Sequence, residues 1–443
     1  MLKKDKPFLA TTHPFVLMLA MTCLPALVSG QNEFYFPPNG NDEWETISPE
    51  NLGWCEDELQ NLRAFLAENQ TRAFLILKDG KIVEETYFDD FDQDRRWYWA
   101  SAAKGLTAFS IGLLQEQEQL SIHESTQTYL GRGWSKATYE DSITLRHQLT
   151  MTSGLDDSNF DCTLDTCLVS LTTPGDRWAY HNGPYTLLTD VIEEVTQKSI
   201  TDFVNEVFEP AGIEGNFLMV SYNRVFFSTP RVMARFGLLM LNEGVWKETT
   251  IMNDTAYFHR MIRPSQDLNP AYGYLWWLNG QEAFILPQSQ NRLNGKLVPN
   301  APDDMYAAFG LGGQILNVVP KQGLVMVRMG DNPQGGLPSI AFNNQIWERF
   351  QKVQDCGTTG HMEKAHQEWT LYPNPAKDFF TIDGPSEKEV VVKIYDLQGK
   401  RIRQELHYQL GTPISTASFK KGVYLIQMEA EGSSQYFKLL LHH

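Results

Sequence analysis

Hydrophobic and polar residues follow two different periods along the first 355 residues. Residues 73–87 carry two strand-like runs around an Asp79-Gly80 turn, a pattern that predicts a β-hairpin. Residues 101–119 place apolar side chains among polar ones at the three- to four-residue spacing of a helix. Residues 181–210 predict two more helices, the second of which ends before Pro210.

The next part of the chain favours strands. Short β-rich runs at 272–278, 307–319 and 324–329 alternate with Gly and Pro, and a helical pattern covers 339–353. A hairpin, helices, strands and a last helix predict an α+β fold in which helices flank an antiparallel sheet, together with a helical subdomain.

The pattern changes after Cys356. Residues 358–368 are polar and predict a linker. Residues 369–443 carry only strand signals with Gly-containing turns, which predicts a small β-sandwich. Strands are expected at 379–382, 390–395, 422–428 and 436–441.

Residues 1–30 predict a secretory signal peptide. Lys3, Lys4 and Lys6 precede an apolar run over 15–28, and the small residue Gly30 marks the expected cleavage site. The run is short for a bilayer span and has no stop-transfer flank, so we expect no transmembrane segment. The alternative is a lipid anchor at Cys23, although Ala20-Met21-Thr22 lacks the small residue expected just before a lipidated cysteine.

Export makes disulfides the expected state of the four remaining cysteines. Four cysteines allow three pairings. Cys162 and Cys167 lie in one polar loop at a spacing that a bridge can close, and Cys55 would then pair with Cys356. No histidine stands at a ligand-like spacing from Cys162 and Cys167, so a metal site is disfavoured.

Composition narrows the possible functions. Hydrophobic residues make up 42% of the chain and charged residues 21%, as in a folded globular protein. The formal charge of -17 disfavours a general nucleic-acid binder, which needs a concentrated cationic surface. The exported chain should also be repelled by anionic membranes.

Ser101 and Lys104 are the candidate catalytic pair. A serine hydroxyl needs a neighbouring base and a site for the developing oxyanion. Positions i and i+3 share one face of a helix, which brings the Lys104 amine beside the Ser101 hydroxyl. Lysine can act as a base only if its pKa is depressed. The alternative is a helix cap at Ser101 with a solvated Lys104.

Two later segments strengthen this hypothesis. Tyr180-His181-Asn182 stands just before a predicted helix, and a phenol near a lysine ammonium can serve as base and then as acid. Gly310 is followed by Leu311, Gly312, Gly313 and Gln314 at the start of a predicted strand, where glycines let backbone approach an acyl group and an N–H group can complete an oxyanion hole.

These motifs, in this order, resemble the serine β-lactamase and penicillin-binding-protein superfamily, in particular its class C-like esterase and peptidase branch. Residues 143–155 are similar to the family segment between the first two motifs, and the resemblance covers about 45–355. It implies a β-lactamase/transpeptidase-like domain over 31–357 that needs no metal or organic cofactor. Carried over by position, Ser101 is the acylated nucleophile, Lys104 its partner, Tyr180 the general base and acid, and Asn182 a donor to substrate. Backbone N–H groups of Ser101 and Gln314 would form the oxyanion hole, and Leu311, Gly312 and Gly313 would contact substrate.

One departure from the family bears on the substrate. Members that hydrolyse drugs or peptides usually carry Lys or His where this chain has Leu311. Losing that charge-assisted hydrogen bond, worth about 1.5 to 3 kcal/mol, argues against an obligatory substrate carboxylate. The nylon-oligomer hydrolases of the superfamily are also similar, but they place a tyrosine where the loop 156–161 offers Phe160.

The tail resembles a second family. Residues 371–376, 379–382, 394–400 and 421–426 look like the C-terminal sorting domain of type IX secretion cargo. This resemblance implies that 369–443 engages the type IX machinery, and that the protein is secreted or attached to the outer cell surface. A carbohydrate-binding β-module is the alternative for these strands.

The sequence therefore predicts a secreted serine hydrolase that cleaves an ester or amide bond of a small molecule through an acyl-enzyme on Ser101. A catalytically silent binding or sensor protein with the same fold is the alternative from another class. A β-lactamase or D,D-peptidase is the third possibility.

Overall fold

The computed structural model describes residues 34–40, 43–331, 338–356, 370–384, 390–396, 400–430 and 433–442. The expected signal peptide over 1–30 and linker over 358–368 lie outside these residues. Among the described residues, no helix combines the length and apolar character needed to cross a membrane.

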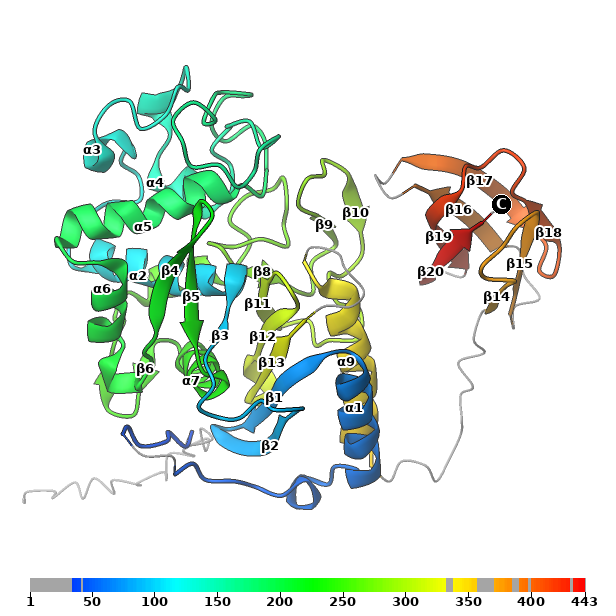
Figure 1. Cartoon of the computed structure of the whole chain (residues 1–443), viewed down its shortest axis with the longest axis horizontal. Helices are drawn as coiled ribbons and strands as arrows, with labels where there is room; N and C mark the ends of the chain where they lie inside the picture. The colour runs from blue at the N-terminus through cyan, green and yellow to red at the C-terminus, as the bar shows by residue number, and fades with distance from the viewer. Residues whose placement is uncertain are drawn as a thin grey trace, which may run out of the picture. The chain divides into compact units, whose positions relative to one another are not determined.

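A six-stranded sheet forms the centre of the region before residue 357. Its strand order is β2-β1-β13-β12-β11-β8, and all neighbouring pairs are antiparallel (Figure 1). The predicted hairpin is present, with Lys78 opposite Lys81 across the turn. The sheet consists of β1 (Thr71–Lys78), β2 (Lys81–Tyr87), β8 (Trp277–Leu278), β11 (Tyr306–Gly310), β12 (Gln314–Val319) and β13 (Leu324–Gly330).

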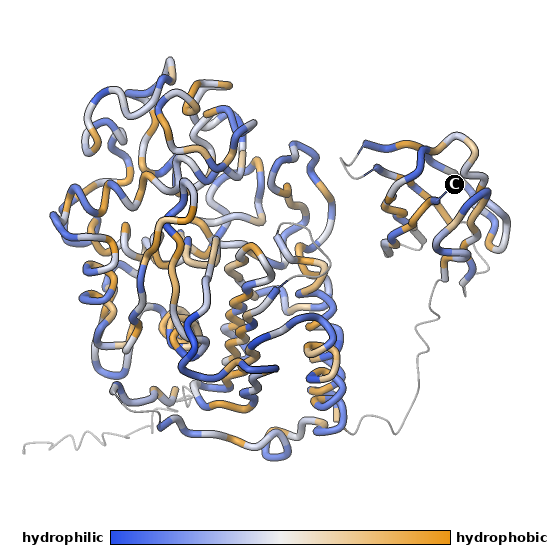
Figure 2. The backbone as a smooth tube through the Cα atoms, in the orientation of Figure 1, coloured by the Kyte–Doolittle hydropathy of each residue, from blue (hydrophilic) through white to orange (hydrophobic). Residues whose placement is uncertain are grey.

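Helices cover both faces of this sheet. Successive side chains of a strand point to opposite faces. In β12, Leu316 faces α7, where Gly237 lies too close to it to accept a Cβ, whereas Asn317 pairs with Asn343 of α9 through two hydrogen bonds of 2.9 and 3.0 Å. Every residue of β12 and β13 is therefore buried, and Figure 2 shows much of the hydrophobic colour in these strands. The covering helices are α1 (Glu56–Glu68), α7 (Pro230–Leu241) and α9 (Ile340–Gln354).

Further helices and short strands make up the rest of the region before residue 357. The predicted helix over 101–119 appears as a 3-10 turn, η2, followed by α2, and the two helices expected in 181–210 are α5 and α6. The helical elements are η1 (Pro49–Leu52), η2 (Ala100–Ala103), α2 (Lys104–Glu116), α3 (Gln127–Leu130), η3 (Glu140–Ser142), α4 (Leu145–Leu149), α5 (Asn182–Thr196), α6 (Ile200–Val207), η4 (Glu209–Ala211), α8 (Thr255–Met261) and η5 (Pro320–Gln322). The short strands are β3 (Trp97–Tyr98), β4 (Asn216–Val220), β5 (Asn223–Ser228), β6 (Val245–Trp246), β7 (Thr249–Thr250), β9 (Ala283–Ile285) and β10 (Arg292–Asn294).

The strand expected over 272–278 is wrong for most of its length. Only Trp277–Leu278 is a strand, because the chain turns back just before it. Leu275 adopts a φ of 62°, and its N–H donates to the carbonyl of Leu149, while the N–H of Gly273 donates to Trp276. A tertiary hydrogen bond thus imposes a turn that the apolar pattern does not reveal.

Among the described residues from 370 onward, strands are the only regular elements, as predicted. One sheet has the order β14-β15-β18 and the other β17-β16-β19-β20. Residues from both sheets, including Phe380, Ile394 and Ile426, are fully buried in one hydrophobic core. The strands are β14 (Thr370–Tyr372), β15 (Phe379–Asp383), β16 (Val390–Tyr395), β17 (Arg401–Tyr408), β18 (Pro413–Ser415), β19 (Gly422–Ala430) and β20 (Ser433–Leu441).

Both expected disulfides are present. Cys55, next to the N-terminus of α1, is bonded to Cys356, just beyond α9, across a sequence separation of 301 residues. Cys162 is bonded to Cys167 within one loop. The first bridge joins the two ends of the sheet region.

Candidate active site

Ser101 lies in η2, one turn before α2 begins at Lys104. The Lys104 Nζ atom is 2.9 Å from Ser101 Oγ, so the predicted i, i+3 pair is in hydrogen-bonding contact. Ala100, immediately before the serine, has a φ of 46°, a left-handed conformation that costs a non-glycine residue about 1–2 kcal/mol. Strained backbone of this kind is typical of functional positions.

Lys104 is a buried amine rather than a solvated surface lysine. Its residue is only 2% exposed, and burial lowers its pKa to about 7, against the opposing effect of the Asp161 charge. Nζ donates a 2.7 Å hydrogen bond to Asn182 Oδ1 and lies 4.0 Å from the ring centre of Tyr185 and 5.0 Å from that of Tyr180. A lysine with this pKa is substantially neutral at physiological pH and has a lone pair available as a base.

Tyr180 is buried beside Ser101 and Lys104. Burial raises the pKa of its phenol, and a hydrogen bond with Ser101 only partly offsets that rise. Its ring stacks on Trp277, with centroids 6.0 Å apart. The phenol therefore keeps its proton at neutral pH in the free protein, which suits the acid half of the expected role as general base and acid, and that role stays a prediction.

Asn182 is the first residue of α5, and its side chain is held at both ends. Its Oδ1 accepts from Lys104, and its Nδ2 donates a 2.6 Å hydrogen bond to Asp161 Oδ1. In this structure the Asn182 amide therefore connects Lys104 to Asp161, and its expected role as a donor to substrate stays a prediction. An amide does this because one end accepts and the other donates.

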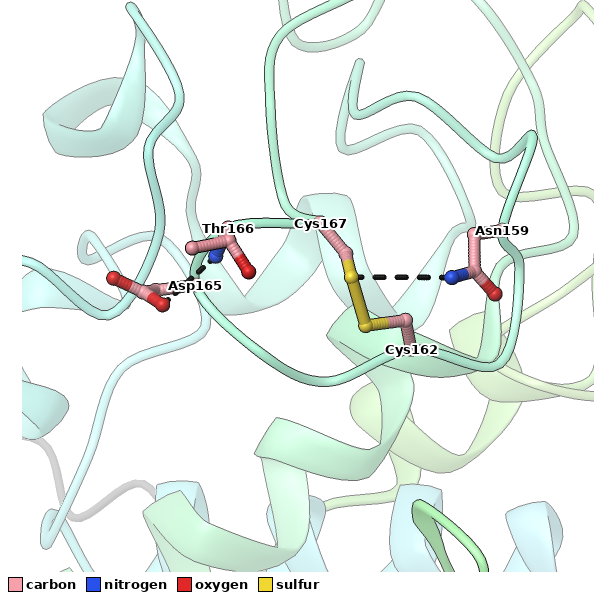
Figure 3. The surroundings of a disulfide bond; sticks show 5 residues. All are labelled: Asn159, Cys162, Asp165, Thr166 and Cys167. Atoms are coloured by element: carbon pink, nitrogen blue, oxygen red, sulfur yellow. Dashed lines mark hydrogen bonds between the residues drawn. A yellow bond between two sulfur atoms is a disulfide. The ribbon is translucent and has the colours of Figure 1, made fainter.

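The loop that carries Asp161 packs against the start of α5. The N–H groups of Asn182 and Gly183 donate to the carbonyl of Phe160, and a Cβ on Gly183 would lie 2.4 Å from the carbonyl oxygen of Cys162. Figure 3 shows the Cys162–Cys167 bridge, with Asn159 Nδ2 3.9 Å from Cys167 Sγ. The disulfide therefore closes the loop one residue beyond Asp161.

The third predicted segment is the turn between β11 and β12. Gly310 lies where a Cβ would be 2.2 Å from the carbonyl oxygen of Trp99, so only glycine lets this strand approach the segment that carries Ser101. Leu311 is 59% exposed, and it lines the site together with Gly310. Gly312, Gly313 and Gln314 are not among the lining residues. Gln314 is buried, and its side-chain amide bonds the carbonyls of Leu311 and Gly330. Its place in the oxyanion hole stays a prediction.

These elements enclose a cavity of about 520 Å³. Its lining includes Ser101, Lys104, Tyr180 and Asn182, so the structure brings the predicted polar side chains together. It also includes residues that the sequence analysis did not assign to the site. Tyr185 follows Asn182 by three residues in α5, so helical spacing alone could have predicted that it lies at the site. Asn223 reaches the cavity from the β4–β5 hairpin, and no sequence pattern near it predicts this position. The other lining residues are Ala100, Phe160, Asp161, Val220, Ser221, Arg224, Val225, Trp277, Pro287, Gln288, Phe309, Gly310, Leu311 and Pro338.

Within the described parts of the chain, no three His, Cys, Asp or Glu side chains are grouped as a metal site would require. The expectation that the reaction needs no cofactor stays a prediction.

The fold is a β-lactamase/transpeptidase-like fold, with the Ser101–Lys104 pair where the sheet region meets the helical part. Residues 60–336, which are more than half of the chain, match the Beta-lactamase family model. The chain therefore belongs to the beta-lactamase family, whose members are serine hydrolases. Residues 370–442 match the Secretion system C-terminal sorting domain, as the tail's resemblance predicted.

Solved structures share the fold at low sequence identity. A Bacillus anthracis protein provisionally described as a 6-aminohexanoate-dimer hydrolase is 19% identical, covering 73% of this chain and 89% of its own, with a TM-score of 0.52. A Bacteroides dorei protein provisionally described as a beta-lactamase is 16% identical, with coverages of 68% and 99% and a TM-score of 0.54. A family VIII carboxylesterase is 15% identical, with the same coverages and a TM-score of 0.50.

Proposed function

We propose that this chain is an exported serine hydrolase that cleaves ester or amide bonds through an acyl-enzyme on Ser101. The observation that carries the proposal is the 2.9 Å contact between Ser101 Oγ and an amine whose burial lowers its pKa to about 7. A serine that meets a neutral amine in a partly apolar cavity can lose its proton without a histidine. A carboxylesterase and a protein provisionally described as a 6-aminohexanoate-dimer hydrolase are among the structural neighbours, which supports a hydrolytic function.

The reaction begins when Lys104 Nζ takes the Ser101 hydroxyl proton as Oγ bonds to the substrate carbonyl carbon. The carbonyl electron pair moves onto its oxygen, which backbone N–H groups at Ser101 and in the β11–β12 turn would stabilise. When this intermediate collapses, the bond to the leaving group breaks. The leaving oxygen or nitrogen takes the Tyr180 phenol proton, and the Lys104 ammonium restores that proton.

Water then completes the cycle by the reverse route. A water molecule attacks the acyl-enzyme carbonyl and gives a proton to Tyr180 while the phenol proton passes to Lys104. When this second intermediate collapses, Lys104 returns a proton to Ser101 Oγ and the acid leaves. Asn182 would hold Lys104 toward Ser101 throughout, since its Oδ1 accepts from Nζ. Ser101, Lys104, Tyr180 and Asn182, the four side chains of this scheme, all line one cavity.

Substrate recognition at the third motif would differ from that of drug-hydrolysing relatives. Leu311 presents an aliphatic side chain at the cavity where a cation would bind a carboxylate. We therefore expect turnover of short-chain esters to exceed turnover of penicillin-type substrates.

Export is the second part of the proposal. Residues 1–30 would direct the chain across the inner membrane, and 369–443 would engage the type IX secretion machinery for release or attachment at the outer cell surface. The match of 370–442 to a secretion sorting domain supports this route.

The test of the activity uses a fluorophosphonate probe and 4-nitrophenyl esters. The intact chain should be labelled and should hydrolyse the esters, and Ser101→Ala should lose both properties. Labelling that persists in Ser101→Ala overturns the proposal. Binding of esters without turnover would favour a silent binding protein, and faster hydrolysis of nitrocefin than of the esters would favour a β-lactamase.

A further inference from the structure

The charged side chains of the cavity differ in whether they form ion pairs within the protein. Lys104, Arg224 and Asp161 are the charged residues among its described lining. Arg224 forms two ion pairs within the protein. Its two terminal nitrogens lie 2.7 Å from Asp190 Oδ1 and 2.8 Å from Glu193 Oε2. Arg224 therefore has no free charge to offer a ligand.

Asp161 has no direct ion pair among the described residues, and its charge reaches Lys104 only across the intervening Asn182 amide. Its Oδ1 accepts from the side-chain amides of Asn182 and Asn223, at 2.6 and 3.3 Å. In the described part of the chain, no Lys, Arg or His nitrogen lies within ion-pair distance of this carboxylate, and its Oδ2 accepts no side-chain hydrogen bond. The residue is only half-buried, so the free oxygen can meet a ligand from the cavity.

Distance places this carboxylate within reach of a bound acyl group. Hydrogen bonds of 2.9, 2.7 and 2.6 Å connect Ser101 Oγ, Lys104, Asn182 and Asp161, so the carboxylate lies within about 10 Å of the serine oxygen. A chain of a few methylene groups on the substrate carbonyl spans that gap. The cavity lining also includes the aromatic residues Phe160 and Trp277, and the faces of aromatic rings attract cations.

The rest of the cavity and the chain favour the same sign of charge. Leu311 supplies no cation for a substrate carboxylate, and the whole chain carries a formal charge of -17, which attracts cations over long range. We infer that the acyl part of the substrate carries a cationic group, of ammonium type, that binds at Asp161. This inference rests on the proposed function, because it names the substrate class of the same site.

The decisive experiment measures binding without turnover. Calorimetry in the Ser101→Ala background, at about pH 8, compares 5-(trimethylammonio)pentanamide with its neutral isostere 6,6-dimethylheptanamide. The cationic amide should bind about tenfold to a hundredfold more tightly. Adding Asp161→Asn should bring this ratio close to one. Adding Asp161→Glu, which keeps the charge, should retain most of it and covers the case in which the Asn variant fails to fold.

Asp165→Asn is the matched control. It makes the same charge change in the same loop, but Asp165 pairs with Lys136 on the surface and does not line the cavity. Its ratio should equal that of the Ser101→Ala parent. Equal binding of the two amides by the parent, or an unchanged ratio in Asp161→Asn, would overturn the inference.

Turnover of the corresponding 4-nitrophenyl esters by the intact enzyme is measured separately. If the cation preference in binding holds but neither ester is hydrolysed, the proposed hydrolase fails and the cation site stands. If both esters are hydrolysed at equal rates and the amides bind equally, the hydrolase stands and the cation site fails.

Discussion

The C-terminal strands and the cavity around Ser101 obey opposite packing rules. In β16, buried and half-buried residues alternate strictly, and Ile394 and its buried neighbours are apolar. Around Ser101, a lysine, a tyrosine and an asparagine are buried together, and Ala100 adopts a left-handed backbone. Burial of apolar side chains accounts for the pattern of β16, whereas a buried polar cluster lowers stability and is the kind of local exception expected at a functional site.

The largest effect that would sharpen this contrast comes from Lys104→Met, which keeps the volume and removes the amine. We expect kcat/KM for esters to fall about 10³-fold or more, because the nucleophile loses its base. Lys136→Met, an exposed surface change, should leave the rate unchanged. Steady-state ester kinetics measures both, and a loss below about tenfold in Lys104→Met would contradict the assigned base.

The strand region supplies the reverse case. Ile394→Ala removes a fully buried side chain and should cost that region about 2–5 kcal/mol of unfolding free energy. Ester turnover by the same variant should not change. Chemical denaturation and kinetics on one preparation check the two statements, and a parallel fall in turnover would break the contrast.

The pH profile of kcat/KM should report the lowered pKa of Lys104 directly. Because burial lowers the pKa of Lys104 to about 7, the neutral amine dominates above that pH and the ammonium below it. We expect kcat/KM to fall about tenfold per unit as pH drops below about 7. Asp161→Asn removes a charge that raises this pKa, so its acidic limb should move to lower pH. A limb that moves upward would contradict the arrangement.

The two disulfides should differ in what they support. Replacing Cys162 and Cys167 by Ser should lower kcat/KM several-fold and cost about 2 kcal/mol, since a short loop beside Asp161 is released. Replacing Cys55 and Cys356 frees a far longer segment and should cost more stability, with little change in rate. Equal effects of both pairs on turnover would show that the loop bridge has no special relation to the site.

The smallest effect concerns Ala100. Glycine adopts a φ of 46° without penalty, so Ala100→Gly should raise the free energy of unfolding by about 1 kcal/mol. Ala103→Gly, at a negative φ three residues on, should lower it by a similar amount. Urea denaturation distinguishes the two variants, and destabilisation by both would mean that Ala100 is unstrained.

Local patterns predicted the elements that local forces determine. The Asp79-Gly80 turn fixes its hairpin, and the helical spacing of Ser101 and Lys104 suffices to bring the pair into contact. The turn at Leu275 depends on a hydrogen bond to Leu149, 126 positions earlier, which no pattern around residue 275 contains.

The same distinction between local patterns and tertiary contacts applies to the site. Ser101, Lys104 and Tyr180 are recognisable from motif order, and the structure places them at one cavity. The bonding of Asn182 to Asp161, and the arrival of Asn223 from a separate hairpin, are tertiary facts. The raised pKa of Tyr180 likewise follows from burial, which a sequence motif does not report.

Acylation of Ser101 is tested most directly by mass spectrometry of the intact chain after brief incubation with a library of small esters. We expect an acyl adduct on the peptide that contains Ser101, which disappears on longer incubation as water releases the acid. Ester turnover with the adduct on another residue, or turnover that persists in Ser101→Ala, would contradict it.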